Sequence, residues 1–590
     1  MRDVLHRRIQ RAGAAVIVGL AAGCAAEALA QTSPAGDPGQ RCDALAGQVG
    51  SALGDPSARI ISAKFNPPSA AKSAASPFPG ASGGLPAMPA HCEVMGVLRE
   101  RTGANGQRYA VKFHLRLPAQ WNGRFLFEGS GGTAGALSDS TGRLQPGMPD
   151  GLDQGYAVVS TDTGHDNKLN NDPTRQGQVA FGHDYMARVE YAETSLDSVA
   201  TTAKRLIRAY YGGGPQRSYF VGCSNGGREG MVFAQRFPDQ FDGIVAQAPA
   251  FAVPKAAIAE AWDTQTFAAL AVEEGLKRPD GLPDITKTFS NADFVILSEA
   301  VAKACDASDG LVDGMVQNLG KCTISRVRPA LAARTCTKGK SAECLSHNQV
   351  DTLIRALGGP HDSKGRQLYA DWPWDVGVGS FGWRIWKTGV PGALDSINIM
   401  LGSPALSGLF ITPPADVGPS TEAGLRYQLD FDFDRDAPKI FATTPDFPRS
   451  GWNLVGAQST NLDRFRAHDG KMIVPHGGSD PIFSINDTER WWGAVNASTG
   501  GKASSFVRVY PVPGMNHCGG GPATDQFDAL AALTAWVEQG KAPERIEAKA
   551  GGQTPWPGRT RPLCAYPSIA VYRSGDPNLS GSFACRKPPA

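Results

Sequence analysis

Val221-Gly222-Cys223-Ser224-Asn225-Gly226-Gly227 is the stretch that decides the fold, because it places a Gly-x-Ser-x-Gly turn directly after a β-branched and aromatic run. A strained turn from a strand into a helix holds a serine hydroxyl clear of the backbone and next to a base. The stretch therefore predicts Ser224 as a nucleophile and residues 228–237 as a helix whose N-terminus faces a developing oxyanion. An ordinary glycine-rich turn is the alternative in a chain with 70 glycines.

Segments with strand and helix patterns alternate around this turn. Apolar residues recur at helical spacing from Leu196 to Tyr210, and Gly212 follows as a helix end. Such alternation is typical of a mostly parallel sheet with helices on both faces, so we predict an α/β-hydrolase fold. Strands are predicted at residues 108–117, 124–127, 156–161, 218–221, 243–248, 471–474 and 506–510, and a closing helix at residues 525–537.

The alternating pattern is interrupted once. From residue 251 to residue 460 the sequence is irregular, carries Trp and Pro, and holds four of the cysteines. We interpret this segment as an insertion over the carboxyl edge of the sheet, a large lid domain. It separates a first part of the catalytic domain, residues 31–250, from a second part, residues 461–590. Residues 66–90 are rich in Pro, Ala, Ser and Gly and are predicted to form a loop.

Composition narrows the class of protein. The chain has 590 residues, of which 41% are hydrophobic and 19% are charged, so it can bury a large core. The formal net charge is +2, and no basic cluster lies outside the extreme N-terminus, which gives no support for nucleic-acid binding. The expected partner is a small molecule, and a monomer is the favoured state.

Residues 1–30 have the pattern of a signal peptide. Four arginines precede an apolar run at residues 14–22, and Ala-Leu-Ala at residues 28–30 offers a cleavage site. Residues 20–24 also resemble a loose lipoprotein box, which would leave Cys24 acylated, but simple secretion is favoured. No other run is long enough to span a membrane. We expect a secreted or periplasmic protein.

Removal of that segment leaves ten of the 11 cysteines. An even count after export into an oxidising compartment predicts disulfides, and the absence of C-x-x-C spacing argues against a zinc site. The sequence does not fix every pairing. Short loops favour three pairs and thereby leave two others: Cys305–Cys322, Cys336–Cys344 and Cys564–Cys585, then Cys42–Cys92 and Cys223–Cys518.

A nucleophilic serine needs a base, and the base needs an acid to orient it. Asp480 follows the predicted strand at residues 471–474, and His517 follows the predicted strand at residues 506–510. The chain order Ser224, Asp480, His517 is the order of an α/β-hydrolase triad. His476 is the main rival base, but Asp480 lies four residues later in the same turn and is more simply its neighbour.

The oxyanion that forms during attack needs amide donors. A glycine-rich loop at residues 128–133 follows the predicted strand at residues 124–127, where an α/β-hydrolase places one donor, and Gly132 is the candidate. The amide of Asn225, directly after the nucleophile, is the second candidate. A flexible surface loop is the alternative for residues 128–133.

Two cysteines flank the candidate nucleophile and base. Cys223 precedes Ser224, and Cys518 follows His517, so a bond between them would hold the two loops together. A disulfide keeps its Cα atoms about 5.5 Å apart, which is compatible with a serine–imidazole hydrogen bond between the adjacent residues. Two unrelated buried cysteines are the alternative.

Cys223-Ser224, Asp480 and His517-Cys518 match the CS-D-HC motif of the tannase and feruloyl esterase family, and nearly the whole mature chain resembles its bacterial members. The resemblance implies a serine carboxylic ester hydrolase that acts on esters of aromatic acids, of feruloyl or galloyl type. It further implies that Trp386 packs on the acyl ring from the lid and that Phe483 lines the other side. Packing in the lid or core is the alternative for both side chains.

The family carries a structural calcium ion in its lid, and residues 306–315 match that site. Three carboxylates with intervening glycines suit a hard cation, and backbone carbonyls complete its shell. A solvated acidic turn is the alternative that the spacing alone leaves open. The resemblance implies the ligands Asp306, Asp309, Leu311, Asp313 and Met315, with Ca²⁺ as the cofactor.

One departure from the family concerns the substrate. Members that hydrolyse mono(2-hydroxyethyl) terephthalate hold its free carboxylate with a lid arginine, and no arginine occurs here between Arg384 and Arg426. That terephthalate ester is therefore the less favoured substrate, with Lys387 as the nearest substitute cation. Asn225 in place of an acidic residue and Ser130-Gly131 in the oxyanion loop are smaller departures. The sequence also leaves open a serine peptidase and a non-catalytic binding protein on the same scaffold.

Overall fold

The computed structural model describes residues 36–74, 83–144 and 148–588. All of these residues belong to one compact unit. The predicted signal peptide, including Cys24, lies outside the described residues. No helix of the described part is long and apolar enough to cross a membrane.

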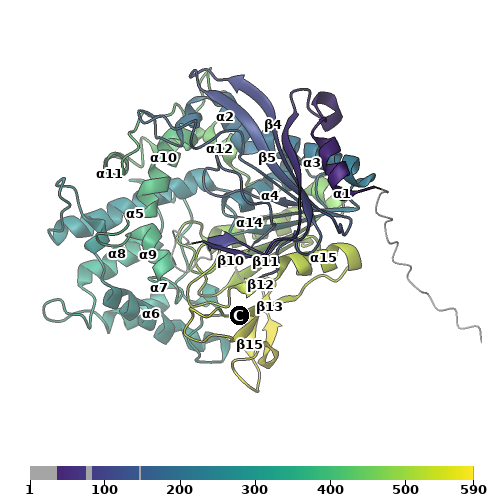
Figure 1. The fold of residues 1–590 in the computed structure, drawn as a ribbon. Helices are drawn as coiled ribbons and strands as arrows, with labels where there is room; N and C mark the ends of the chain where they lie inside the picture. The colour runs from purple at the N-terminus through teal and green to yellow at the C-terminus, as the bar shows by residue number, and fades with distance from the viewer. Residues whose placement is uncertain (1–35, 75–82, 145–147, 589–590) are drawn as a thin grey trace, which may run out of the picture. The chain divides into compact units, whose positions relative to one another are not determined.

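A nine-stranded sheet organises the described residues, with the strand order β1-β4-β5-β7-β6-β8-β9-β10-β11 (Figure 1). The six strands from β7 to β11 pair in parallel, and β1, β4, β5 and β7 pair antiparallel. The strands are β1 (Arg59–Asn66), β4 (His91–Thr102), β5 (Arg108–Pro118), β6 (Arg124–Glu128), β7 (Ala157–Thr161), β8 (Arg217–Cys223), β9 (Gly243–Gln247), β10 (Lys471–Gly477) and β11 (Val507–Val512).

Both faces of the parallel part are buried, and alternate residues of each strand point to opposite faces. On β8, Phe220 packs into the cluster that holds α3 (Ser195–Tyr211) and α4 (Asn225–Arg236), whereas Tyr219 and Val221 pack into the cluster that holds α15 (Ala529–Gln539). α14 (Ile485–Ser498) lies with α3 and α4, and Figure 1 shows α14 and α15 near β10 and β11. The predicted α/β architecture is confirmed.

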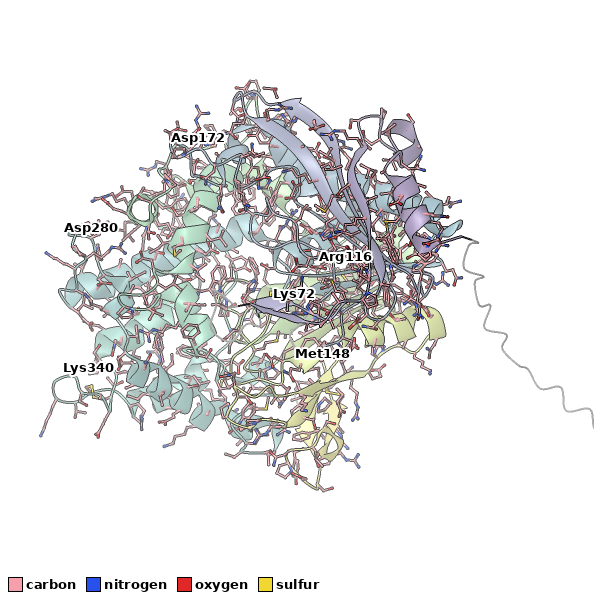
Figure 2. All side chains as sticks on the ribbon, viewed as in Figure 1. Lys72, Arg116, Met148, Asp172, Asp280 and Lys340 are labelled. Carbon is pink, nitrogen blue, oxygen red and sulfur yellow. A yellow bond between two sulfur atoms is a disulfide. The ribbon has the colours of Figure 1, made fainter. Side chains whose placement is uncertain are left out.

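Arg116 marks the antiparallel side of the sheet. Its guanidinium group pairs with Glu93 at 2.9 Å, and Glu93 also contacts His114 at 2.9 Å. The hydrogen bond from His114 and the charge of Arg116 lower the pKa of Glu93 to about 2, although burial opposes them. Figure 2 shows Arg116 among densely packed side chains, whereas Asp280 and Lys340 lie at the periphery. Arg116 and His114 are buried, Glu93 is partly exposed, and the charge of Arg116 is matched by Glu93.

Three small antiparallel sheets and three further helices accompany the main sheet in the described part of the chain. They are β2 (Lys72–Ala74) with β3 (Gly83–Leu85), β12 (Gln526–Phe527) with β13 (Arg545–Lys549) and β14 (Thr560–Cys564), β15 (Ile569–Tyr572) with β16 (Phe583–Arg586), and the helices α1 (Pro38–Leu45), α2 (Tyr185–Val189) and α13 (Asp463–Ala467).

The segment from 251 to 460 separates β9 from its parallel neighbour β10, so it is an insertion between adjacent strands of the sheet. Its description as irregular was wrong, because it is largely helical. α5 is buried nearly all round and therefore lacks the one-sided apolar stripe that reveals a surface helix. The helices are α5 (Val253–Glu273), α6 (Asn291–Cys305), α7 (Ile324–Ala332), α8 (His347–Leu357), α9 (Phe381–Lys387), α10 (Ser403–Ala405), α11 (Thr421–Leu429) and α12 (Gly451–Val455).

Three other local predictions need correction. α4 begins at Asn225 and not at residue 228, directly after the nucleophile turn. The closing helix begins at Ala529 and not at residue 525, because Asp528 caps it by accepting the amide hydrogen bond of Ala531 at 2.8 Å. The predicted loop at residues 66–90 contains β2 and β3, although residues 75–82 lie outside the described residues.

The described residues contain five disulfides, with the five pairings predicted from the sequence. Four of them join residues no more than 50 positions apart. The fifth joins Cys223 at the end of β8 to Cys518 after β11, across 295 positions. The bonds are Cys42–Cys92, Cys223–Cys518, Cys305–Cys322, Cys336–Cys344 and Cys564–Cys585.

Candidate active site

Ser224 lies on the sharp turn between β8 and α4. Its backbone has φ of 64° and ψ of −123°, a region that a non-glycine residue rarely adopts, so the turn is strained. A Cβ atom at Gly222 would lie 2.6 Å from the backbone carbon of Gly226, so only glycine allows this close approach. Backbone hydrogen bonds of 3.1 Å fix the turn, from the Ser224 amide to Gln247 and from the Ala250 amide to Ser224.

Asp480 and His517 come together from the loops after β10 and β11. Nδ1 of His517 lies 2.8 Å from Oδ2 of Asp480, and Oδ1 of Asp480 accepts the amide hydrogen bonds of Ile482 and Phe483 at 2.9 and 3.0 Å. Burial alone would raise the pKa of Asp480. The charge of His517 and hydrogen bonds from His476 and His517 outweigh it and hold this pKa well below its usual range.

His476, the rival base, is fully buried behind this pair. One ring nitrogen contacts Thr488 Oγ1 at 2.9 Å and the other contacts the Phe483 carbonyl at 2.9 Å, with Asp480 Oδ2 at 3.5 Å. Both nitrogens are thus engaged inside the core, and the arrangement makes His476 a support for Asp480.

The Cys223–Cys518 disulfide and Gln247 both connect the serine turn to the histidine loop. The disulfide holds its Cα atoms 6.0 Å apart. Gln247 lies at the end of β9, and its backbone carbonyl accepts a hydrogen bond from the Ser224 amide. Its side-chain Nε2 donates a hydrogen bond to the Cys518 carbonyl at 3.0 Å. The Ser224 hydroxyl makes no hydrogen bond with a described residue; a serine–histidine bond often tightens only when substrate is bound.

The loop after β6 packs against the start of α4. Glu229 accepts hydrogen bonds from the Ser130 amide at 2.9 Å and from the Ser130 hydroxyl. Asn225 Nδ2 donates to Ser130 Oγ and to Glu229 Oε1, each at 2.9 Å. The backbone amides of Gly132 and Asn225 donate no hydrogen bond to a described residue, and both residues line the same pocket as Ser224.

Sequence reasoning missed the residues that fix this loop. Tyr191 donates its hydroxyl hydrogen bond to Asn225 Oδ1 at 3.0 Å, and Arg228 donates from Nε to the same atom at 2.7 Å. Glu229 and Gln247 were also missed. Tyr191, Glu229 and Gln247 act through neighbours that are distant in sequence, and Arg228 acts on Asn225 one turn away, so the only local signal was polar side chains at the start of a buried helix.

Two aromatic side chains line the pocket beside His517. The Trp386 ring on α9 lies 5.8 Å from the His517 ring, and the Phe483 ring lies 5.3 Å from it, both edge to face. The pocket is largely apolar. Its lining residues are Gly132, Thr133, Tyr191, Ser224, Asn225, Ala250, Val253, Ala257, Glu260, Trp386, Leu401, Gly402, Ala405, Phe410, Ile482 and Phe483.

Lys387, the nearest candidate for a substitute cation, is not among the described residues that line the pocket. Its ammonium group pairs with Asp263 in the core, where both side chains are 2% exposed, and lies 4.5 Å from the centre of the Trp372 ring. The charge of Lys387 is therefore already matched inside the insertion.

The acidic loop at 306–315 lies at the end of α6, far along the chain from the triad. Asp306 accepts the amide hydrogen bonds of Asp313 and Gly314 at 3.2 and 2.8 Å, and Asp313 also pairs with Arg561 of β14. Burial, with the charges of Asp313 and Asp306, raises the pKa of Asp309 to about 7. Among the described residues, no group of three His, Cys, Asp or Glu side chains is placed to hold a metal ion.

Comparison with known proteins assigns the family. The family model for tannase and feruloyl esterase matches residues 92–586. The chain belongs to the tannase and feruloyl esterase family. As a member of this family of ester hydrolases, it is a carboxylic ester hydrolase.

Relatives and solved structures agree with this family assignment. The chain is 45% identical over 524 residues to mono(2-hydroxyethyl) terephthalate hydrolase of Piscinibacter sakaiensis, covering 85% of this chain and 86% of that protein. It is 30% identical over 499 residues to a probable feruloyl esterase of Arthroderma benhamiae, covering 81% and 83%. The fold matches feruloyl esterase B from Aspergillus oryzae with a TM-score of 0.71 at 22% identity, covering 93% of this chain and 100% of that one.

Proposed function

We propose that this tannase-family chain hydrolyses esters of aromatic acids, of feruloyl or galloyl type, through an acyl-enzyme intermediate. The observation that carries the proposal is one apolar pocket that contains Ser224, two unpaired backbone amides and two aromatic rings next to the His517–Asp480 pair. Aromatic walls suit a planar acyl group, since flat rings pack closely against one another.

In this mechanism, Ser224 attacks the ester carbonyl and His517 accepts its proton. Asp480 binds Nδ1 of His517, which leaves Nε2 to act as the base and holds the charge of the imidazolium. The amides of Gly132 and Asn225 stabilise the tetrahedral oxyanion. His517 then protonates the leaving alcohol, and a water molecule, deprotonated by His517, releases the acid from Ser224.

Trp386 and Phe483 are proposed to hold the aromatic acyl group. Trp386 comes from the insertion and Phe483 from the loop that carries Asp480, so the two rings approach His517 from different parts of the chain. We propose that the insertion acts as a lid, because it supplies Trp386, Leu401 and Phe410 to the pocket.

Mono(2-hydroxyethyl) terephthalate is a second candidate substrate, because a relative named for its hydrolysis is 45% identical. Its acyl group carries a carboxylate, and such a group binds best to a paired cation. No Lys or Arg is present among the described residues that line the pocket. Neutral phenolic esters are therefore favoured over this substrate.

The deciding experiment compares methyl ferulate, methyl gallate and mono(2-hydroxyethyl) terephthalate as substrates of the purified mature protein and of Ser224→Ala. We expect turnover that depends on Ser224 and favours the two neutral esters. A feruloyl amide assayed beside the ester tests for peptidase activity. Failure of the wild-type protein to react with a fluorophosphonate probe would favour a non-catalytic binding protein.

We propose that the protein is exported and is secreted or periplasmic. Five disulfides support it, because such bonds persist in oxidising compartments outside the cytosol. Mass spectrometry of the exported protein distinguishes cleavage after Ala30 from acylation of Cys24.

A structural calcium ion in the loop at 306–315 is also proposed. Asp306 and Asp309 are 4% and 3% exposed, and their like charges lie close enough to disfavour one another, which a divalent cation would relieve. To hold it, the carboxylates of Asp306, Asp309 and Asp313 would have to turn from their described positions toward one point, and the carbonyls of Leu311 and Met315 would complete the shell. Bound calcium would fix the end of α6 to the C-terminal strands, since Arg561 already reaches Asp313 from β14.

A further inference from the structure

Glu260 on α5 is the only Asp, Glu, Lys, Arg or His among the described residues that line the pocket. Its side chain belongs to a residue that is 8% exposed, and it makes no hydrogen bond with any described residue. A buried carboxyl group without a partner is costly, so its presence in the pocket of the nucleophile calls for a partner from outside the protein.

The position of Glu260 along α5 places it at the far end of the pocket from the reacting carbonyl. The Ala250 amide bonds to the Ser224 carbonyl, and Val253, Ala257 and Glu260 then line the pocket from successive turns of one helix face. The helical rise puts Glu260 about 10 Å beyond Val253 along the axis. Glu260 is therefore suited to contact the distal edge of an acyl group whose ester lies at Ser224.

The neighbours of Glu260 leave its carboxyl group free. Asp263, one turn further along α5, binds Lys387 of α9 and Asn398. Further along the insertion, a Cβ atom at Gly402 would overlap Oε2 of Glu260, so the glycine leaves the space that this carboxyl group occupies. Lys387 is thus paired with Asp263, whereas Glu260 faces the pocket.

We propose that Glu260 determines acyl specificity by hydrogen bonding to a hydroxyl group on the distal edge of the aromatic ring. This inference rests on the proposed function and adds the substituent that the pocket recognises. A phenolic hydroxyl both donates and accepts, and a protonated carboxyl group does the same, so the two groups are complementary. A ring that lacks the hydroxyl leaves Glu260 unpaired.

Burial of Glu260 keeps its carboxyl group protonated at neutral pH, against the charge of Lys387. Burial raises the pKa of Glu260 to about 8, and Asp263 adds to the rise while Lys387 opposes it. Asp263 and Lys387 are the charged groups that act on it, and the η7 segment (Asn398–Gly402) contacts it through glycine. Ionised Glu260 would repel an acyl group that carries a carboxylate, such as the terephthalate monoester.

The test compares methyl 4-hydroxycinnamate with methyl cinnamate, which differ by one ring hydroxyl, at pH 6.5. We expect wild-type kcat/KM to favour the hydroxylated ester by about 10-fold, the effect of one satisfied hydrogen bond. Glu260→Leu should bring this ratio close to one, whereas Glu260→Gln should retain most of it, because an amide also donates and accepts.

A partly buried acid elsewhere provides the control. Burial also raises the pKa of Glu489, to about 7, but Glu489 lies outside this pocket. Glu489→Leu should leave the substrate ratio at the wild-type value. An unchanged ratio in Glu260→Leu, or an equal loss on both esters in a folded variant, would overturn the proposal. Absence of Ser224-dependent turnover of both esters by wild type would reject the proposed function, and this inference with it.

A pH profile tests the same idea without relying on a variant that folds. A 4-methoxy group only accepts hydrogen bonds, so it needs the proton of Glu260. We expect the kcat/KM ratio of methyl 4-methoxycinnamate to methyl cinnamate to fall about 3-fold as pH rises through about 8. Ionisation of the triad changes kcat/KM for both esters by the same factor, so it does not affect this ratio. A flat wild-type profile, or the same fall in Glu260→Gln, would contradict the proposal.

Discussion

Asp480 is the residue through which the candidate base is held in place. It binds His517 with one carboxylate oxygen and two loop amides with the other, while His476 supports it from behind. Because the carboxylate of Asp480 is fully buried, loss of any of these hydrogen bonds leaves part of its charge without a partner. The geometry of one side chain thus sets both the tautomer and the orientation of the base.

Replacement of Asp480 by Asn should lower kcat by about 10⁴-fold, because the amide would favour the wrong tautomer of His517. We expect KM to change little, since the pocket walls remain. Steady-state hydrolysis of methyl ferulate gives both constants. Asp371→Asn, which breaks an exposed ion pair with Arg490, is the control and should stay within about 2-fold, the effect of a surface ion pair.

A loss of less than about 10-fold in Asp480→Asn would mean that another group orients His517. Asp375 would then be the next residue to test, because it is fully buried and binds Ser479 and the Gly514 amide in the same two loops.

At the scale of elements, seven of the nine strands of the main sheet, the site loops and the place of the insertion were predictable, whereas β1, β4 and the helices of the insertion were not. The strand at residues 218–221 stands out as an apolar run before glycine, and Ser224, Asp480 and His517 each follow a strand that the sequence reveals. α5 is buried on nearly all sides, so its sequence lacks the alternation of apolar and polar residues with helical period that predicts a surface helix.

The residues that support the site escaped sequence analysis for a different reason. Glu229 matters because it meets Ser130, 99 positions away, and Gln247 matters because it meets Cys518, 271 positions away. Glu260 matters because the fold brings it to the pocket of Ser224. None of these pairings leaves a local pattern, since each depends on which strands and helices become neighbours.

The acidic loop after α6 should make stability depend on calcium. A ligand that binds only the folded state adds free energy of unfolding of about 2.7 kcal/mol at 100 times its Kd. We therefore expect the Tm to rise when Ca²⁺ is added to protein treated with chelator, as measured by differential scanning fluorimetry. Mg²⁺ should act more weakly, because it demands a smaller octahedral shell.

Asp309→Asn provides the matched variant for that experiment. It removes one charge from the loop and should abolish most of the Ca²⁺-dependent rise in Tm. Asp280→Asn, an exposed acid in the same insertion, should preserve the rise. A chelated wild-type protein whose Tm does not respond to Ca²⁺ would reject the metal site and leave a solvated acidic turn as the interpretation of residues 306–315.

At the scale of the whole described molecule, the catalytic residues come from two parts of the chain that the insertion separates. Ser224 belongs to the part before it, and Asp480 and His517 belong to the part after it. Parallel pairing of β9 with β10 joins the two parts within the sheet, and the Cys223–Cys518 disulfide joins them at the site itself. The insertion can therefore contribute pocket residues without interrupting the sheet.

The double variant Cys223→Ser/Cys518→Ser should lose both stability and activity. In the chain-entropy model, a disulfide that joins residues 295 positions apart contributes about 5–6 kcal/mol to the free energy of unfolding. The Cys336→Ser/Cys344→Ser control removes a bond across 8 positions, worth about 2–3 kcal/mol in the same model. Chemical denaturation measures both losses. If the two double variants lost equal stability and kept equal kcat, the disulfide at the site would have no special part in joining the serine turn to the histidine loop, and the hydrogen bonds of Gln247 would have to hold them alone.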